Sequence, residues 1–456
     1  MQTWWQKWKK PLVFVPFAVG AIGYLLAGEP FTNALYASFA LYFTNPISDA
    51  YNGLIELARW TAPIAMVGAI LEVLQKYSRA LDLWICSHKN GSAAVYSDLD
   101  LQLAENDRIH FLYAGERFQK HCKTHLILFS SDEENLRFYE KHKQALSKRK
   151  VYIGLRELEQ GLAKLPSDVT VFDINQAAAR KLWEKIHLWN FGCTAPKIAI
   201  YGGGTLASTV LSVGLQLNLF DPAQKVEYTL IAENPTFHIR HPDFSTMNGD
   251  VIRYVSPAQE EAWACIREAD YVIIAEQVSL ETLQTIAVQT YRGELYCYAP
   301  EDGPACECLA FHKPDPFGQN SELLTADTIC GEALIQDARA LHKSYCKQNP
   351  DQATSWETLS GFLKCSNISL ADFSQVIAQL PDTISDKDAA RLEHIRWCRF
   401  HFLNYWRKSE PGTPKNIALR LHPDLISYDD LPEKEREKDM ILVAHARSEN
   451  QLSDSL

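Results

Sequence analysis

Uncharged residues are concentrated in two segments near the start of the chain. Residues 11–28 carry no charged side chain, and this length is close to the roughly 20 residues that a helix needs to cross a bilayer. Residues 54–76 form a second apolar segment, with Glu56 and Arg59 in its first turns. The pattern predicts two transmembrane helices in a hairpin that covers residues 1–80. A signal peptide is the alternative for the first segment, but no small-x-small cleavage site follows it.

The connector between the two predicted spans contains an apolar run, 31–43, that is too short to cross a membrane. Thr44, Asn45 and Pro46 end this run, and Asp49 follows. A short helix buried in a bundle would aim its negative carboxyl end at an ion path. The sequence therefore predicts a re-entrant helix, with Thr44, Asn45 and Asp49 lining a pore. A helix that lies on the outer leaflet is the alternative.

Two further features bear on how this hairpin would work. Pro63 and Gly68 lie in the middle of the second span, where a proline removes a backbone hydrogen bond, so they form a candidate gating hinge. Basic residues precede the first span and follow the second. They are Lys7, Lys9, Lys10, Lys76 and Arg79. By the positive-inside rule, both termini are expected in the cytoplasm, in a multi-pass protein of the cell inner membrane.

From about residue 90 onward, short β-branched runs alternate with amphipathic helices, which is typical of parallel-sheet α/β domains. The first such block covers residues 90–190 and the second covers residues 196–315. In the first block, strands are predicted at 93–96, 125–129, 151–155 and 169–172, and helices at 133–146 and 176–186. The first of these strands leads into Ser97 and Asp98 rather than glycines, so no nucleotide site is expected there.

After Pro316 the strand signals stop, and residues 328–450 show helical periodicity. The predicted fold class is therefore α/β with a helical membrane hairpin. It comprises two Rossmann-like parallel-sheet domains followed by a mostly α-helical domain.

The second block opens with a predicted strand, 197–201, that leads into a glycine-rich turn. The motif is G-x-G-x-x-A, formed by Gly202, Gly203, Gly204, Thr205, Leu206 and Ala207. Gly202 would permit a tight turn, Gly204 the approach of a phosphate to a helix N-terminus, and Ala207 close packing of that helix on the strand. Glycines that only pack a helix on a sheet are the alternative.

Acidic and small residues downstream complete this candidate site. A strand predicted at 226–232 ends next to Glu233, whose carboxylate would bind ribose hydroxyls. A buried strand predicted at 270–276 ends with Ala275 and Glu276, which would border the same crevice. The expected ligand is NAD(H) or an adenine nucleotide.

Composition and missing motifs exclude several function classes. A net charge of −11 argues against a protein whose main partner is nucleic acid. No Ser-His-Asp order, His-Glu-x-x-His helix or P-loop lysine is present, so we expect no catalytic residues and no enzyme. A membrane-tethered NAD-dependent oxidoreductase remains an alternative. Cys306 and Cys308 lie near His312 but lack a second pair, so no metal site is expected.

The helical region resembles the ryanodine receptor repeat (RyR) domain of bacterial proteins. The resemblance rests on residues 391–397, on the segment 422–425, and on Tyr428 and Leu431. Aromatic rings beside Arg399, Arg407, Lys408 and Lys415 could stack a base and neutralise phosphate, which would form a nucleotide pocket. The candidate ligand residues of this RyR-like region are Glu393, His394, Trp397, Trp406, His422 and Tyr428. An aromatic core with solvated basic edges is the alternative interpretation of these residues.

The two α/β blocks resemble the tandem TrkA-N or RCK regulatory domains of potassium channels and transporters, with residues 131–136 matching a helix start there. The resemblance implies a homo-oligomer, with a tetramer expected, in which a bound nucleotide acts on pore helices in the lipid bilayer. The predicted function is a nucleotide-gated ion channel, with cations as the expected ions. A membrane-anchored nucleotide or second-messenger sensor, or a stress or defence effector scaffold without ion conduction, is the alternative.

Overall fold

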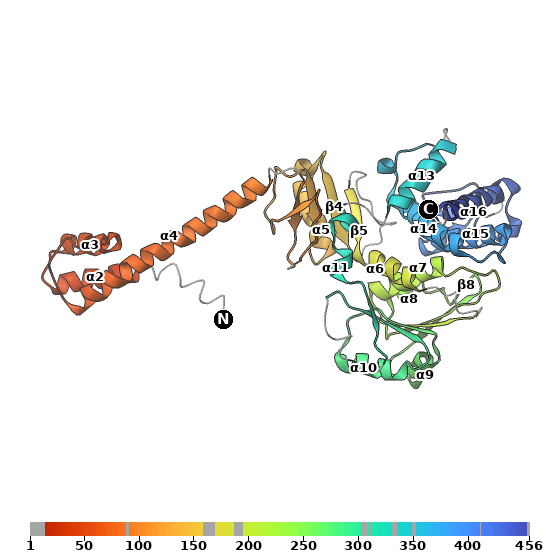
Figure 1. Cartoon of the computed structure of the whole chain (residues 1–456), viewed down its shortest axis with the longest axis horizontal. Coiled ribbons are helices and arrows are strands. Elements are labelled where there is room, and N and C mark those ends of the chain that lie inside the picture. Colours follow the sequence, from red (N-terminus) through yellow and green to blue (C-terminus); the bar gives the residue numbers. More distant parts are fainter. Residues whose placement is uncertain are drawn as a thin grey trace. The chain divides into compact units, whose positions relative to one another are not determined.

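The computed structural model describes most of the chain, and Figure 1 labels many of its elements. The described residues are 14–87, 91–99, 101–157, 169–186, 195–301, 309, 312–330, 335–348, 353–410 and 412–453. The chain divides into two compact units, Met1–Lys89 and Asn90–Leu456. The predicted hairpin lies in the first unit, and the predicted α/β blocks and helical region lie in the second.

The first unit consists of helices that pack through small residues. Its elements are α2 (Val15–Leu26), α3 (Phe31–Ala40), the 3-10 turn η1 (Leu41–Phe43) and α4 (Gly53–Ser87). A Cβ on Gly20 of α2 would lie 2.5 Å from Ser38 Oγ on α3 and 3.2 Å from Ala58 Cβ on α4. The Asn52 side chain, at the start of α4, donates to Gly23 O of α2 at 2.7 Å. Such close backbone approach at small residues is typical of helices packed in membranes.

The lengths of these helices bear on the predicted spans. Within the described residues, one segment is long and apolar enough to cross a membrane, Gly53–Leu71 of α4. The α4 helix continues through Pro63 and Gly68 without a break and reaches about 52 Å. The α2 helix has 12 residues and reaches about 18 Å, less than the roughly 30 Å hydrocarbon core. Residues 11–13 of the predicted first span lie outside the described residues, so the two-span topology stays a prediction.

The outer surface of the first unit is apolar. Of the 31 exposed large hydrophobic residues in the described chain, 19 lie between Phe14 and Leu74. Along α4, Trp60 is 71% exposed and Ile64 is 70% exposed. Soluble monomers rarely expose apolar side chains at this density, so the surface is suited to contact with lipid or with other subunits.

The second unit begins with a five-stranded sheet in the order β2-β1-β3-β4-β5, and every pair of strands in it is parallel. The strands are β1 (Ser92–Tyr96), β2 (His110–Tyr113), β3 (Thr124–Ile127), β4 (Lys150–Leu155) and β5 (Val169–Asp173). Helix α5 (Asp132–Leu146) connects β3 to β4, and α6 (Ile174–Lys185) follows β5. The edge strand β2 was not predicted, because only its two central residues are buried.

The second sheet has seven strands in the order β12-β11-β10-β6-β7-β9-β8, and all pairs except β8 with β9 are parallel. The strands are β6 (Lys197–Tyr201), β7 (Glu227–Ile231), β8 (Thr246–Met247), β9 (Asp250–Val255), β10 (Tyr271–Ile274), β11 (Glu294–Tyr298) and β12 (Asp315–Phe317). The helices between them are α7 (Thr205–Leu217), α8 (Thr236–Arg240), α9 (Glu260–Glu268) and α10 (Leu280–Gln289).

The two faces of this sheet are covered by different helices. Side chains of α9 and α10 form one core with Val272 and Ile274 of β10. Side chains of α7 join α6 and the C-terminal helices in a larger core on the other face, where Ile198 and Ile200 of β6 are buried. The larger core also includes Tyr152 of the first sheet, so both sheets share it.

Short helices and turns lead from β12 back to the first sheet, and longer helices complete the unit. The elements are α11 (Asn320–Leu323), α12 (Ala326–Ile329), α13 (Gln336–Gln348), η5 (Trp356–Thr358), α14 (Gly361–Gln379), α15 (Asp386–Leu403), β13 (Arg407–Lys408), β14 (Leu421–His422), η6 (Tyr428–Asp430) and α16 (Glu433–Ser453). The return is fixed by hydrogen bonds from Ala104 N to Leu324 O and from Ala326 N to Ala104 O. The two short strands β13 and β14 interrupt a region that was predicted to be helical.

Buried ion pairs fasten the C-terminal helices to the rest of the unit. Arg399 of α15 donates to Asp250 Oδ2 of β9 at 2.7 Å, and both side chains are almost fully buried. Arg180 of α6 donates to both oxygens of Asp372 on α14, at 2.6 and 2.5 Å. The helical region therefore packs as one body with both sheets.

The fold class is confirmed at the level of an α/β protein with parallel sheets. The predicted strand 197–201 has the bounds of β6, and the predicted helix 133–146 differs from α5 by one residue at its start. About half of the described chain is helical.

Candidate functional site

The glycine-rich turn lies between β6, a central strand of the second sheet, and α7. Gly202 has φ of +133°, a conformation that side chains strongly disfavour. A Cβ there would also lie 3.1 Å from Glu276 Oε2 and 3.3 Å from the Ala275 carbonyl carbon. Position 202 is therefore restricted to glycine by conformation and by the close approach of β10.

The start of α7 is open on its outer side. Gly204 is the N-cap, it makes no side-chain capping bond, and a Cβ at this position would touch nothing within 4 Å. Leu206 and Ala207 are buried in the core, so they contribute to the motif by packing α7 on the sheet. The Thr205 hydroxyl accepts a hydrogen bond from Asn175 Nδ2 of α6 at 3.2 Å. The N-terminus of α7 is thus accessible at Gly204, and it is held in place by the hydrogen bond between Asn175 and Thr205.

A carboxylate lies at the same turn. Glu276 Oε2 accepts a hydrogen bond from Gly203 N at 3.2 Å. Backbone N–H groups at such a turn are the donors that a pyrophosphate would use. In this conformation Glu276 therefore holds one of the donors that a nucleotide would need, and its negative charge would repel a phosphate.

Glu233 lies two residues beyond the end of β7, at the same edge of the sheet as the glycine turn. Its Oε1 accepts a hydrogen bond from the Ser256 hydroxyl at 2.6 Å, just beyond the end of β9. The Glu233 side chain is exposed, while Ala275 is buried next to Gly202. The structure thus brings Glu233, Ala275, Glu276 and the glycines to the carboxyl ends of neighbouring parallel strands.

The candidate residues of the helical region separate into two groups. One is an aromatic cluster, which we define as Phe362, Trp397, Phe400, His401, Trp406 and His422. The His401 ring lies 4.0 Å from the Trp397 ring, and the His422 ring lies 4.9 Å from it. Burial lowers the pKa of His401 to about 3 and that of His422 to about 4, so both imidazoles are neutral at pH 7.

The other candidates serve packing contacts. Both oxygens of Glu393 accept hydrogen bonds from Arg396, at 2.7 and 2.8 Å, and both side chains are at most 2% exposed. His394 Nε2 lies 2.9 Å from Ile426 O, and its ring is stacked on Trp397 and lies 6.1 Å from the Tyr428 ring. Trp397, Trp406 and His422 are therefore brought together, whereas Glu393 is engaged by a buried ion pair.

The predicted pore residues follow η1 in the first unit. Thr44 has φ of +56°, and its hydroxyl donates to Phe43 O at 2.7 Å. Thr44, Asn45 and Asp49 are all exposed in the single chain. Because α4 runs unbroken through Pro63 and Gly68, the predicted hinge is a regular helix in this conformation.

Sequence reasoning missed two residues of α6 that position α7, the helix that follows the glycine turn. Asn175 links the starts of α6 and α7 because its Nδ2 donates to Thr205 Oγ1 at 3.2 Å. The same Nδ2 donates to Arg156 O, just after β4, at 2.9 Å. Trp183 of α6 donates to Val210 O at 2.9 Å, and a Cβ on Gly214 would meet its ring at 2.6 Å. A tryptophan that follows a strand by ten residues and a glycine within the next helix could have indicated that the two helices pack closely.

The described residues contain no group of three or more His, Cys, Asp or Glu side chains arranged to hold a metal ion. Cys306 and Cys308 lie outside the described residues. The chain matches no protein-family model, no curated protein and no solved structure.

Proposed function

We propose that the protein is a membrane-embedded, nucleotide-regulated channel. In this proposal a NAD(H) or adenine nucleotide binds at the glycine turn of the second sheet, and the first unit forms the ion path in an oligomer, with a tetramer expected. The protein would lie in the cell inner membrane with both termini in the cytoplasm.

The observation that carries the nucleotide part is the strand order around the glycine turn. Taken along the chain, the parallel strands β6, β7, β9, β10, β11 and β12 lie in the order 3-2-1-4-5-6, with the antiparallel β8 added at one edge. This is the usual order of dinucleotide-binding folds, whose ligands lie at the carboxyl ends of the strands where the order reverses. The reversal is between β6 and β10, and Gly202 and Ala275 lie at that point. The first sheet has the order 2-1-3-4-5, which also occurs in doubly wound folds.

The residues at this point fit a nucleotide on one condition. Gly202 permits the turn and Gly204 leaves open space before α7. In the proposal, the exposed carboxylate of Glu233 would accept hydrogen bonds from ribose hydroxyls. Glu276 must release the N–H of Gly203 before a phosphate can use that donor. In the proposal, ligand binding therefore displaces Glu276 at the end of β10, which gives the bound and free states a structural difference.

The membrane part is supported by the apolar outer surface of the first unit and by its close helix packing. A subunit with one or two spanning helices cannot enclose an ion path alone, so a channel would require several copies. The α3 helix with η1 is a short element of the kind that re-enters pores, and Thr44 and Asn45 follow it.

The test is current across a planar bilayer that contains the purified protein, with NAD, NADH, ATP and ADP added in turn. We expect unitary currents that change with one of these nucleotides. In Gly204→Glu a carboxylate would occupy the open space before α7, so current should persist and the nucleotide response should be lost. If Gly204→Glu still binds nucleotide with unchanged affinity, the nucleotide does not bind at the glycine turn.

A second candidate is a membrane-anchored nucleotide sensor or effector scaffold without an ion path. It is favoured by the finding that one segment of the described chain, Gly53–Leu71, is long and apolar enough to span a membrane. One spanning helix is enough to anchor such a sensor, which needs no ion path. Folded, inserted protein that binds nucleotide but passes no current under any condition would support this candidate.

A further inference from the structure

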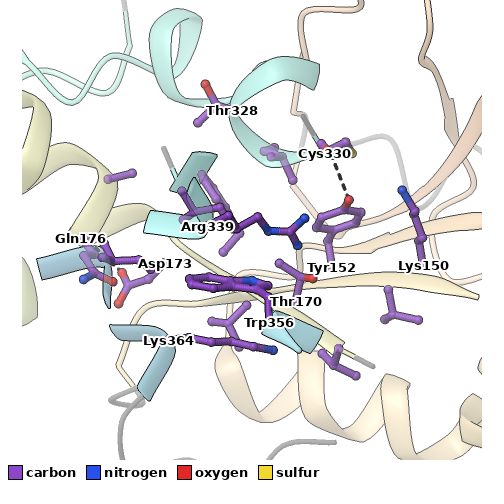
Figure 2. Close-up of a pocket in the computed structure, with 18 of the residues that line it drawn as sticks. Lys150, Tyr152, Thr170, Asp173, Gln176, Thr328, Cys330, Arg339, Trp356 and Lys364 are labelled. Carbon is purple, nitrogen blue, oxygen red and sulfur yellow. Dashed lines mark hydrogen bonds between the residues drawn. The ribbon is translucent and has the colours of Figure 1, made fainter. Parts of the chain in front are cut away.

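The C-terminal helices are fixed to the first sheet as well as to the second. A cavity of about 590 Å³ lies between β4, β5 and the start of α6 on one side and α12, α13, η5 and α14 on the other. Figure 2 shows side chains of both walls, and the Tyr152 hydroxyl of β4 donates across to Cys330 O at 3.0 Å. Three basic side chains of the lining, Arg180, Arg339 and Lys364, have partners within the protein. Any surface feature of the C-terminal region is therefore held in a fixed position on the second unit.

The segment that connects β13 to β14 ends in a turn closed by its own backbone. Asn416 N donates to Leu421 O and Leu421 N donates to Asn416 O, both at 2.9 Å. The Asn416 side chain also accepts a hydrogen bond from Leu419 N at 3.0 Å, and Arg420 has φ of +53°. Residues 417–420, which we call the tip, are therefore held in one shape by hydrogen bonds.

Three consecutive apolar residues of the tip are exposed. Ile417 is 74% exposed and Leu419 is 67% exposed, and Ala418 between them is exposed as well. No other large hydrophobic side chain in the described chain exceeds the exposed fraction of Ile417. Consecutive exposed apolar residues are unusual on a protein surface unless they serve an interaction. The tip is therefore suited to insertion into an apolar partner.

Basic side chains accompany these apolar residues in the same segment. Residues 407–420 contain four basic side chains and one acidic side chain, which gives a net charge of +3 in a chain whose net charge is −11. Arg407 and Lys408 of β13 are exposed, and so is Lys415. The Lys415 Nζ lies 5.3 Å from the centre of the Trp406 ring. The segment is therefore a local positive patch with an apolar tip.

From these features we propose that the segment docks on an anionic membrane surface. Ile417 and Leu419 would enter the boundary between headgroups and acyl chains, and the exposed basic side chains would lie near anionic headgroups. A nucleotide or a nucleic acid is disfavoured here because bases stack on aromatic rings, and the Trp406 ring beside Lys415 is only 4% exposed. The inference goes beyond the proposed function because it gives the second unit a membrane contact of its own. It holds for a channel and for a membrane-anchored sensor alike.

The test measures hydrogen–deuterium exchange of residues 412–422 in the full chain, in nanodiscs of phosphatidylcholine alone or of an equal mixture with phosphatidylserine. Exchange should be slower by about tenfold or more in the anionic nanodiscs, since each basic residue near such a surface strengthens binding about fivefold. Ile417→Ser/Leu419→Ser removes the apolar side chains without removing a hydrogen-bonding group of the turn, and should make exchange equally fast in both lipids. Arg407→Glu/Lys408→Glu should have the same effect, because the net charge of the segment changes from +3 to −1.

The matched control is Leu280→Ser/Val288→Ser, which makes the same kind of change on α10, where the two side chains are 54% and 59% exposed. It should leave the slow exchange of the tip unchanged. Co-elution of the chain with the nanodiscs tests the proposed membrane location separately. A chain that stays outside them is mixed with vesicles of the same two compositions, and exchange of the tip is measured there in the same way.

Two results would overturn the proposal by showing that anionic lipid does not cover the tip. One is equal exchange in neutral and anionic lipid, and the other is slow exchange that persists in Ile417→Ser/Leu419→Ser. Slow exchange that depends on protein concentration rather than on lipid would also overturn it, because a second copy of the chain would then cover the tip.

Discussion

Glu276 is the residue whose charge would most directly oppose the proposed nucleotide binding. Its Oε2 lies 3.2 Å from Gly203 N and would lie about as close to any Cβ at position 202. Glu276→Gln keeps an acceptor for that N–H but removes the negative charge next to the phosphate position. We expect nucleotide affinity, measured by calorimetry, to rise about tenfold, which corresponds to about 1.4 kcal/mol.

The control for this prediction is Glu281→Gln, an exposed carboxylate in the first turn of α10. It should leave nucleotide affinity unchanged. If Glu276→Gln instead weakens binding, Glu276 contacts the ligand directly, as a carboxylate that accepts hydrogen bonds from ribose hydroxyls would.

Asp173 predicts a dependence of stability on pH. Its folded-state pKa is raised to about 7 by burial, whereas an unfolded aspartate titrates near 4. The protonated Asp173 carboxyl therefore contributes fully to stability below about pH 4, and this contribution is lost as the pH rises through 7. Asp173→Asn keeps an N-cap acceptor for Gln176 N but does not titrate. Between pH 5 and pH 8.5, we expect the free energy of unfolding of this variant to rise by about 1–2 kcal/mol relative to that of the native protein.

This prediction is measured by denaturant unfolding at several pH values without phosphate in the buffer. Asp107→Asn, at an exposed position, serves as the control and should show the same pH dependence as the native protein. If the difference in free energy of unfolding between Asp173→Asn and the native protein does not change with pH, Asp173 is ionised throughout this range.

At the scale of elements, the ion pair between α15 and β9 joins the C-terminal helices to the second sheet. Arg399 also donates to Leu215 O at 2.8 Å and to Met247 O at 2.9 Å, and its side chain is 1% exposed. Arg399→Met would leave the Asp250 carboxylate buried without its partner, which typically costs about 3–5 kcal/mol. We expect this loss in the free energy of unfolding, measured with denaturant.

A second substitution separates charge from packing. Asp250→Asn on the Arg399→Met background keeps the oxygen that accepts Val226 N–H at 2.9 Å and removes the buried charge. The double variant should recover a large part of the lost stability. A double variant as unstable as Arg399→Met alone would indicate that the hydrogen bonds from Arg399 to the carbonyl oxygens of Leu215 and Met247, rather than its ion pair, hold α15 in place.

How far the sequence predicted these elements depends on the range of the interactions. The strand that became β6 and the turn at Gly202 were predictable, because an apolar run followed by glycines is a local signal. The edge strand β2 was not, since it has only four residues and two of them are exposed. The contact between Glu276 and Gly203 was not predictable either, because the two residues are 73 positions apart and meet only through the pairing of β10 with β6.

At the scale of the whole molecule, α4 is the element through which binding in the second unit could act on the first. It begins in the apolar segment at Gly53 and continues as a helix to Ser87, close to the boundary of the units at Lys89. A continuous helix transmits displacement, whereas a glycine–serine linker behaves as a flexible coil. If the protein is the proposed nucleotide-regulated channel, inserting eight glycine and serine residues after Lys89 should therefore abolish the effect of nucleotide on current.

The same insertion should leave nucleotide affinity and the nucleotide-free current unchanged, because neither depends on the connection. The matched control places these residues after Gly115, in an exposed turn of the second unit with φ of +55°, and should preserve regulation. Regulation that survives the insertion after Lys89 would exclude α4 as the coupling element. The nucleotide would then have to act through direct contacts between the second unit and the pore, or between second units of neighbouring subunits.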